Sequence, residues 1–161
     1  MIVDSFCIIL IVVFLMLTHE LGHLISAKLL GLKIHKVGFT LRPIPHFYVA
    51  IQWPSKKWHE LVFLFAGSFV TLVFFAALFV FHFFDSHILY TAVAIQLVME
   101  TNPFYSDYVF ATLNAAEQGN TININTYSFY EKLKDYRYSF KWNIHFILWA
   151  LVICFLLKNR F

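Results

Sequence analysis

Two histidines and a glutamate lie within one helical turn of a strongly apolar stretch. His19, Glu20 and His23 belong to the sequence HELGH. On an α-helix, residues four apart lie about 40° from each other around the axis, so both imidazoles can face one metal ion. Glu20 can reach a water molecule beside that ion and accept its proton. The residue types and their spacing therefore predict a hydrolytic zinc site with one ion.

A third zinc ligand is expected, because catalytic zinc sites usually offer three protein ligands and one water. Asp107 is the best candidate. If one helix enters the membrane near Asp4 and another near Ile88, a rise of 1.5 Å per residue puts both His23 and Asp107 about 28 Å deep, with His19 at about 22 Å. Both helices run from outside to inside, so these groups meet at one level near the inner surface.

Asn102 and Pro103 follow the apolar run of residues 88–101. A proline removes one backbone donor and frees a carbonyl one turn earlier. At membrane depth this is tolerated only where the backbone lines a cavity or finds another partner. We expect the break to lie beside the metal site; the alternative is a simple helix end at the interface. Glu100 either orients a ligand imidazole or is an interfacial charge.

The composition requires a membrane around these residues. The chain has 161 residues, of which 60% are hydrophobic and 13% charged, against about 45 to 50% and about 25% in soluble domains. We predict an all-α membrane protein with a single domain over residues 1–161 and about four transmembrane helices, at about 5–32, 61–84, 88–101 and 142–157. The last segment is short and is the one that could fail to cross.

Lysine and arginine are unevenly distributed between the connecting segments. Residues 28–60 hold six and residues 102–141 hold four. The positive-inside rule places both segments in the cytoplasm. We therefore expect a multi-pass membrane protein with its active site toward the cytoplasmic side. A bacterial cell membrane is the expected location. The net charge of +3 fits this topology better than a nucleic-acid partner, and none is expected.

A small β-hairpin is predicted on the cytoplasmic side after the first span. The runs LKIHKVGFTL and HFYVAIQW are rich in β-branched and aromatic residues, and they flank a proline-rich link at residues 42–45. This is the pattern of two strands joined by a turn. The hairpin offers an edge for an extended peptide.

Taken together, these motifs resemble the site-2 protease family of intramembrane zinc metalloproteases. The resemblance rests on HELGH in the first core helix and on NPFYSD, residues 102–107, late in the third. It extends to the strand segment around residues 31–39 and to Glu60 through Gly67 at the start of the second core helix. The chain departs from the family at Ser68, Thr71 and Tyr108, where members usually carry Pro, Asn and Gly.

The resemblance implies an enzyme that hydrolyses peptide bonds of membrane peptides or transmembrane proteins. His19, His23 and Asp107 would hold Zn²⁺, Glu20 would be the base, and Asn102 would donate a hydrogen bond to the oxyanion or hold the substrate. Two alternatives remain open. One is a catalytically idle relative that binds a membrane peptide or partner, in an immunity or scaffold role. The other is a metal-ion transporter, which would spread polar residues along a path through the bilayer.

The remaining polar residues are expected to have structural roles. His145 is predicted to be solvated or capped at a membrane boundary, and Trp149 to mark an interface or a packing site. Cys7 and Cys154 are expected to be buried free thiols, with a disulfide between them as the alternative.

Overall fold

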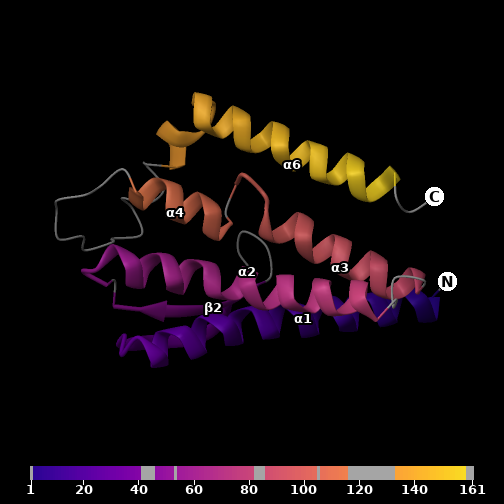
Figure 1. Ribbon diagram of the computed structural model, residues 1–161, viewed down its shortest axis with the longest axis horizontal. Coiled ribbons are helices and arrows are strands. Elements are labelled where there is room, and N and C mark those ends of the chain that lie inside the picture. The colour runs from indigo at the N-terminus through magenta and orange to yellow at the C-terminus, as the bar shows by residue number, and fades with distance from the viewer. Residues whose placement is uncertain are drawn as a thin grey trace. The chain divides into compact units, whose positions relative to one another are not determined.

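The computed structural model of the chain describes residues 2–40, 46–52, 54–81, 86–104, 106–115 and 133–158. They divide into two compact units, residues 1–97 and 98–161, and each unit is described by itself. Both are mostly helical, and the first also contains a small antiparallel sheet (Figure 1). The single membrane domain expected from the sequence stays a prediction.

Helix α1, Ile2–Leu29, has one buried face and one exposed apolar face. The buried residues recur every three or four positions, as one face of a helix requires; they are Leu15, His19, Gly22, His23, Ser26 and Ala27. Large apolar side chains on the other faces are exposed, among them Phe6, Leu10, Phe14, Leu17 and Leu21. A helix with this pattern can face lipid on one side and protein on the other.

Gly31 ends this helix earlier than predicted. Its φ of 66° lies in the left-handed region, which glycine adopts without steric cost. The Leu32 N–H donates to the Ala27 carbonyl at 2.8 Å and the Gly31 N–H to the Lys28 carbonyl at 3.2 Å. These two bonds are the Schellman pair that closes a helix end. The predicted boundary at Leu32 was therefore wrong by three residues.

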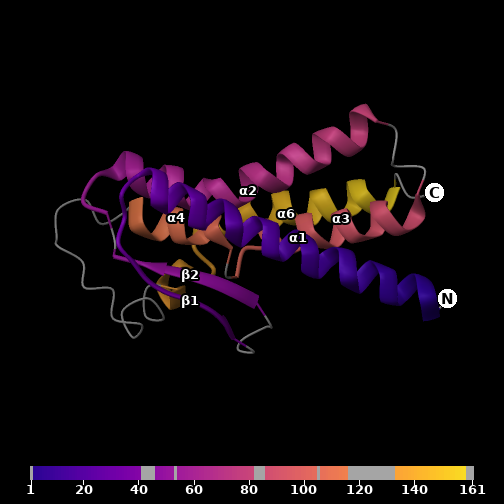
Figure 2. The same cartoon turned by 90° about the horizontal axis from the view of Figure 1, so that it is seen from below.

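Helix α2, Lys57–Val80, packs along α1 in the first unit (Figure 2). The helices approach closely at Gly22, where an added Cβ would lie 2.7 Å from the carbonyl oxygen of Ala66. Phe14 and Phe74 meet edge to face at the other end of the contact, with ring centroids 6.1 Å apart. The absence of a side chain at Gly22 allows the two backbones to come together at the level of the histidines.

The predicted β-hairpin is confirmed. Strands β1, Ile34–Thr40, and β2, His46–Ile51, pair antiparallel, with Val37 opposite Val49. The register shifts between Ile34 and Lys36, so one residue of β1 is extra. Strand β2 contacts α1, whereas β1 has mostly exposed or half-buried side chains. The proline-rich link lies outside the described residues.

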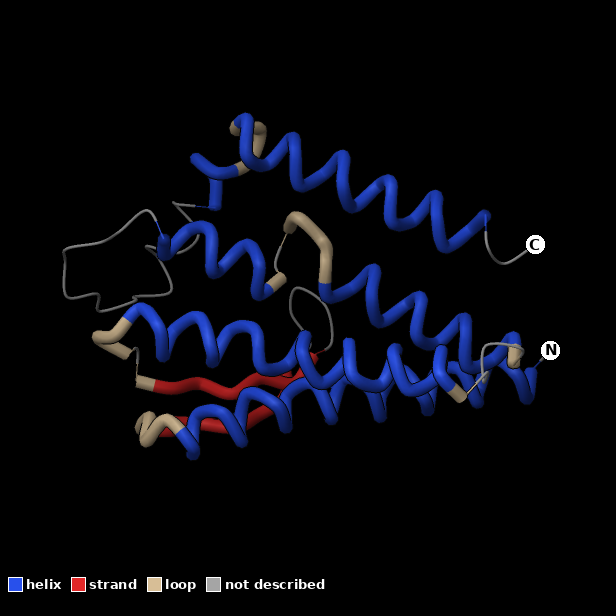
Figure 3. Tube along the Cα trace, in the orientation of Figure 1, coloured by secondary structure: helices blue, strands red, loops and turns tan. Residues whose placement is uncertain are grey.

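The second unit is built around a broken helical segment (Figure 3). Only the last residues of helix α3, His87–Glu100, belong to this unit. After a turn the chain continues as α4, Asp107–Ala115. Residues 133–136 form one helical turn before α6, Phe140–Lys158. The core of this unit joins α4, this turn and the start of α6; its buried members are Val109, Leu113, Leu133, Tyr136 and Trp142.

Three helices are long and apolar enough to cross a membrane: α1, residues Lys57–Leu78 of α2, and α6. Three of the four predicted spans thus coincide with helices that are candidate spans by length and composition. The segment predicted at 88–101 is helical but has only 14 residues as α3, or about 21 Å. The described helices α2 and α6 also begin four and two residues earlier than predicted.

Candidate metal centre

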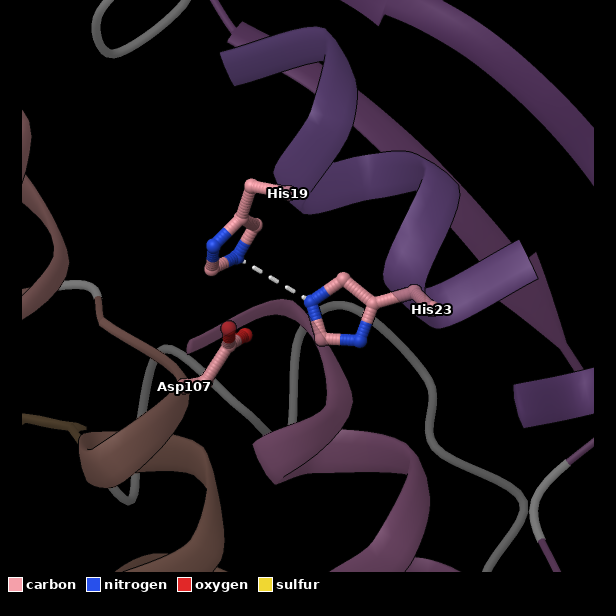
Figure 4. A group of neighbouring side chains, drawn as sticks. All are labelled: His19, His23 and Asp107. Carbon is pink, nitrogen blue, oxygen red and sulfur yellow. Dashed lines mark hydrogen bonds between the residues drawn. The ribbon is translucent and has the colours of Figure 1, made fainter. Parts of the chain in front are cut away.

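The two imidazoles of the HELGH sequence lie side by side on the buried face of α1. His19 is 9% exposed and His23 is 4% exposed. Their Nε2 atoms are 3.2 Å apart (Figure 4). One turn of α1 thus brings together two nitrogen atoms as the spacing predicted.

The ring orientation of His23 is set by helix α2. Its Nδ1 lies 2.7 Å from the backbone carbonyl oxygen of Phe63. A carbonyl only accepts hydrogen bonds, so Nδ1 carries the proton and the lone pair of the ring resides on Nε2. In metal-ligating histidines the ring nitrogen that does not bind the metal typically donates its N–H to a carbonyl or carboxylate, which fixes the tautomer and the ring plane.

Gly67 of α2 provides the space that the two rings need. A Cβ at this position would lie 2.5 Å from Nε2 of His19 and 2.6 Å from Nε2 of His23. Any other residue would therefore place a side chain against both candidate donor atoms. The structure fits a metal ion at this point, because two imidazole nitrogens converge where α2 has no side chain.

Glu20 is half-buried and follows His19 on α1. One helical residue turns the side chain by about 100°, so Glu20 lies on the flank of the face that buries the histidines. This position is compatible with a carboxylate beside the metal ligands. Its role as a base stays a prediction.

Asp107 is the first residue of α4 and is half-buried. A carboxylate is favourable in the first turn of a helix, where backbone N–H groups and the helix dipole are positive. Ser106, just before it, is 5% exposed, and its Oγ has no hydrogen-bond partner in the described part of the chain. This helix start thus places a half-buried carboxylate next to a buried hydroxyl.

Asn102 holds the turn between α3 and α4. Its side-chain amide donates to the Met99 carbonyl, and its Oδ1 accepts a hydrogen bond from the Phe104 N–H at 2.9 Å. The side chain is 3% exposed. These contacts assign Asn102 a structural role in its own turn, and its predicted role toward a substrate stays a prediction. Glu100 ends α3, half-buried, and its proposed contact with an imidazole also stays a prediction.

Among the described residues, His19, His23 and Asp107 form a group that could hold a metal ion. The imidazoles belong to the first unit and Asp107 to the second, so the place of Asp107 in the ligand set belongs to the proposal below. The sequence-based analysis missed Phe63, whose carbonyl orients His23, and the contact made by Gly67. A glycine inside an apolar helix was the available signal, since it often marks a close approach.

The two cysteines lie away from this centre in sequence. Both are free thiols, as expected. Cys7 is half-buried and Cys154 is exposed, so the prediction that both are buried was wrong. Exposure on an apolar helix fits a side chain that faces lipid.

No protein-family model, curated protein or solved structure matches the chain.

Proposed function

We propose that the protein is an intramembrane zinc metalloprotease of the site-2 protease type. The observation that carries the proposal is the pair of buried imidazoles, whose Nε2 atoms lie 3.2 Å apart beside Gly67. Two buried histidines and a glutamate within one turn of an apolar helix are costly in a membrane unless they have a function. A metal site with a base gives all three a function.

The donor set favours zinc. In the proposal His19 and His23 contribute nitrogen and Asp107 contributes oxygen, which leaves a fourth position open for water or substrate. Two histidines with one carboxylate are a ligand set found in zinc peptidases.

In the proposal the metal centre lies among helices that cross the membrane. The candidate spans are α1, α2 and α6. We propose that α3 and α4 together make a fourth, interrupted crossing, because their 14 and 9 residues amount to about 34 Å of helix against a hydrocarbon core of about 30 Å. The interruption then lies within the membrane near its cytoplasmic side, as does the metal centre.

In the proposed reaction a peptide of the membrane is cut. A bound Zn²⁺ would supply a Lewis acid that polarises the scissile carbonyl and lowers the pKa of the attacking water. Glu20 accepts the proton of that water and passes it to the leaving amine. His23 keeps its Nε2 directed at the site because its Nδ1–H is held by the Phe63 carbonyl.

The hairpin is the proposed docking edge for the substrate. A helix cannot be cleaved until its scissile segment is extended, and an exposed strand edge stabilises an extended chain through backbone hydrogen bonds. In the described hairpin, β1 pairs with β2 on one side only. Substrate addition along β1 is consistent with its exposed side chains.

A comparison of Glu20→Gln with the wild type tests the proposal. Membrane peptides of cells producing each form would be compared by mass spectrometry, together with the zinc content of each purified protein. We expect Glu20→Gln to keep its zinc and to let an uncut peptide or protein accumulate. Glu60→Gln is the matched control, because it makes the same chemical change in the first turn of α2.

An unchanged peptide pattern with zinc bound would contradict proteolysis and support the idle binding protein instead. Zinc-free wild-type protein would contradict both the enzyme and its metal centre. The two outcomes are separate, because the metal content is measured on the same preparations.

A further inference from the structure

The break between α3 and α4 leaves backbone carbonyls that need donors. Pro103 has no N–H, so the Met99 carbonyl loses the partner that a continuous helix would give it four residues later. The other carbonyls of the last turn lose their partners because the helix ends. An unpaired carbonyl costs about 1 to 3 kcal/mol when buried, and more in a bilayer where no water replaces the donor.

Side chains supply three of these donors. Asn102 donates to the Met99 carbonyl. The indole Nε1–H of Trp149 donates to the Val98 carbonyl at 2.9 Å, and Nε2 of His145 lies 2.9 Å from the Thr101 carbonyl. Two of the three donors come from α6, more than 40 residues further along the chain.

His145 is held by a second hydrogen bond. Because its Nε2 carries the proton that reaches the Thr101 carbonyl, its Nδ1 is an acceptor, and the hydroxyl of Tyr136 donates to it at 3.3 Å. Tyr136 is 7% exposed, and burial raises the pKa of its hydroxyl, which keeps it a donor. Of the two predicted states of His145, solvated or capped, the structure therefore shows the capped one, with a partner at each ring nitrogen.

The two donors of α6 share one face of the helix. Trp142, His145 and Trp149 recur at spacings of three and four, and Trp142 is buried while the other two are half-buried. Phe104, inside the break, meets the rings of Trp142 and Trp149 edge to face at 6.1 and 6.2 Å. Polar and aromatic contacts of α6 therefore act on the same short segment, residues 98–104.

We propose that His145 and Trp149 are positioning residues, which hold the backbone of the break so that Asp107 begins α4 at a fixed place in the second unit. The role in metal binding rests on the function proposed above. The hydrogen bonds themselves do not, since each one lies within the second unit. His145 and Trp149 thus act on the metal ligand through the turn that precedes it.

Four variants separate donation from packing. His145→Leu and Trp149→Phe remove the N–H but keep an apolar side chain of similar or somewhat smaller size. His145→Gln keeps an amide N–H near the position of Nε2. Phe146→Leu is the control, because Phe146 packs on Trp142 and Trp149 without donating to the break.

The first readout is hydrogen exchange of the metal-free protein in detergent, followed over residues 98–115. We expect about tenfold faster exchange in His145→Leu and Trp149→Phe, and near wild-type exchange in His145→Gln and Phe146→Leu. Equal acceleration in Phe146→Leu and Trp149→Phe, or no rescue by glutamine, would show that only packing matters and would overturn the proposal.

The second readout is the visible absorption spectrum and affinity of bound Co²⁺, used as the probe metal. We expect about tenfold weaker binding and an altered spectrum in the two donor-deficient variants, with both restored in His145→Gln. If these variants exchange faster but bind Co²⁺ as the wild type does, positioning of Asp107 is refuted. If the wild type binds no Co²⁺, the proposed metal centre fails, and the exchange data still decide whether α6 holds the break.

Discussion

Replacing Gly67 with alanine tests the metal centre through one methyl group. The new Cβ would lie 2.5 Å from Nε2 of His19 and 2.6 Å from Nε2 of His23, whereas ordinary contacts of a Cβ begin at 3.4 Å. The nitrogens would have to retreat by 3.4 − 2.5 = 0.9 Å and 3.4 − 2.6 = 0.8 Å. Both candidate ligands are therefore displaced by a change in the neighbouring helix.

The displacement is large for a metal site. Zinc–nitrogen distances are about 2.0 to 2.1 Å, with a tolerance of about 0.2 Å. We expect zinc affinity to fall at least about 100-fold, the upper end of what lost ligand support costs, equivalent to about 2.7 kcal/mol. The same substitution should stabilise helix α2, since alanine stabilises a helix by about 0.5 to 1 kcal/mol over glycine. The fold should therefore persist while zinc affinity falls.

The assay is competition for zinc between the purified protein and a chelator, with helicity measured by circular dichroism on the same samples. Ser68→Ala is the matched control, because it places the same residue one position along α2 and removes a buried hydroxyl that has no partner in the described part of the chain. We expect it to bind zinc as the wild type does. If Gly67→Ala binds zinc with unchanged affinity, the imidazole pair is not the metal site.

Three further predictions concern the second unit. Asn102→Asp removes the donor to the Met99 carbonyl and should lower the unfolding midpoint in detergent by the equivalent of about 1 to 3 kcal/mol; an unchanged midpoint would contradict the role of this side chain in the break. Ser106→Ala should not lower thermal stability, because the buried hydroxyl has no partner in the described part of the chain, and it should lower cleavage if the hydroxyl serves the site; unchanged cleavage would limit Ser106 to packing. Burial raises the pKa of Tyr136, so its stabilising contribution is complete below the unfolded value of 10.0 and is lost as pH rises through the folded value. The thermal unfolding midpoint of the wild type should therefore fall more than that of Tyr136→Phe as pH rises above 10.0, and parallel pH profiles would refute this.

Local chemistry was sufficient to predict much of the fold. Long apolar runs predicted the helices, and two runs of β-branched and aromatic residues predicted the hairpin. The end of α1 was misplaced because an apolar pattern continues past Gly31, whereas the left-handed conformation of this glycine stops the helix. The short α3 ended where Asn102 and Pro103 predicted, since a proline acts through its own covalent structure.

At the site, too, features set by neighbouring residues could be predicted from the sequence, whereas contacts between helices could not. The pairing of His19 with His23 follows from helical spacing alone, and the structure confirms it. The contacts of Gly67 and the donors from His145 depend on which helices pack together, and no pattern within one helix contains that information. For a histidine at a membrane boundary the sequence leaves two states open, solvated or capped, and only the packed helices show which carbonyl it reaches.

Zinc bound per chain, measured on purified wild type and on His23→Leu, tests the central claim most directly. His23→Leu removes the nitrogen whose orientation the Phe63 carbonyl fixes. The account predicts about one zinc per wild-type chain, with imidazole nitrogen in its X-ray absorption spectrum, and little or none in the variant. A wild-type chain without zinc, or equal zinc in both proteins, would contradict it.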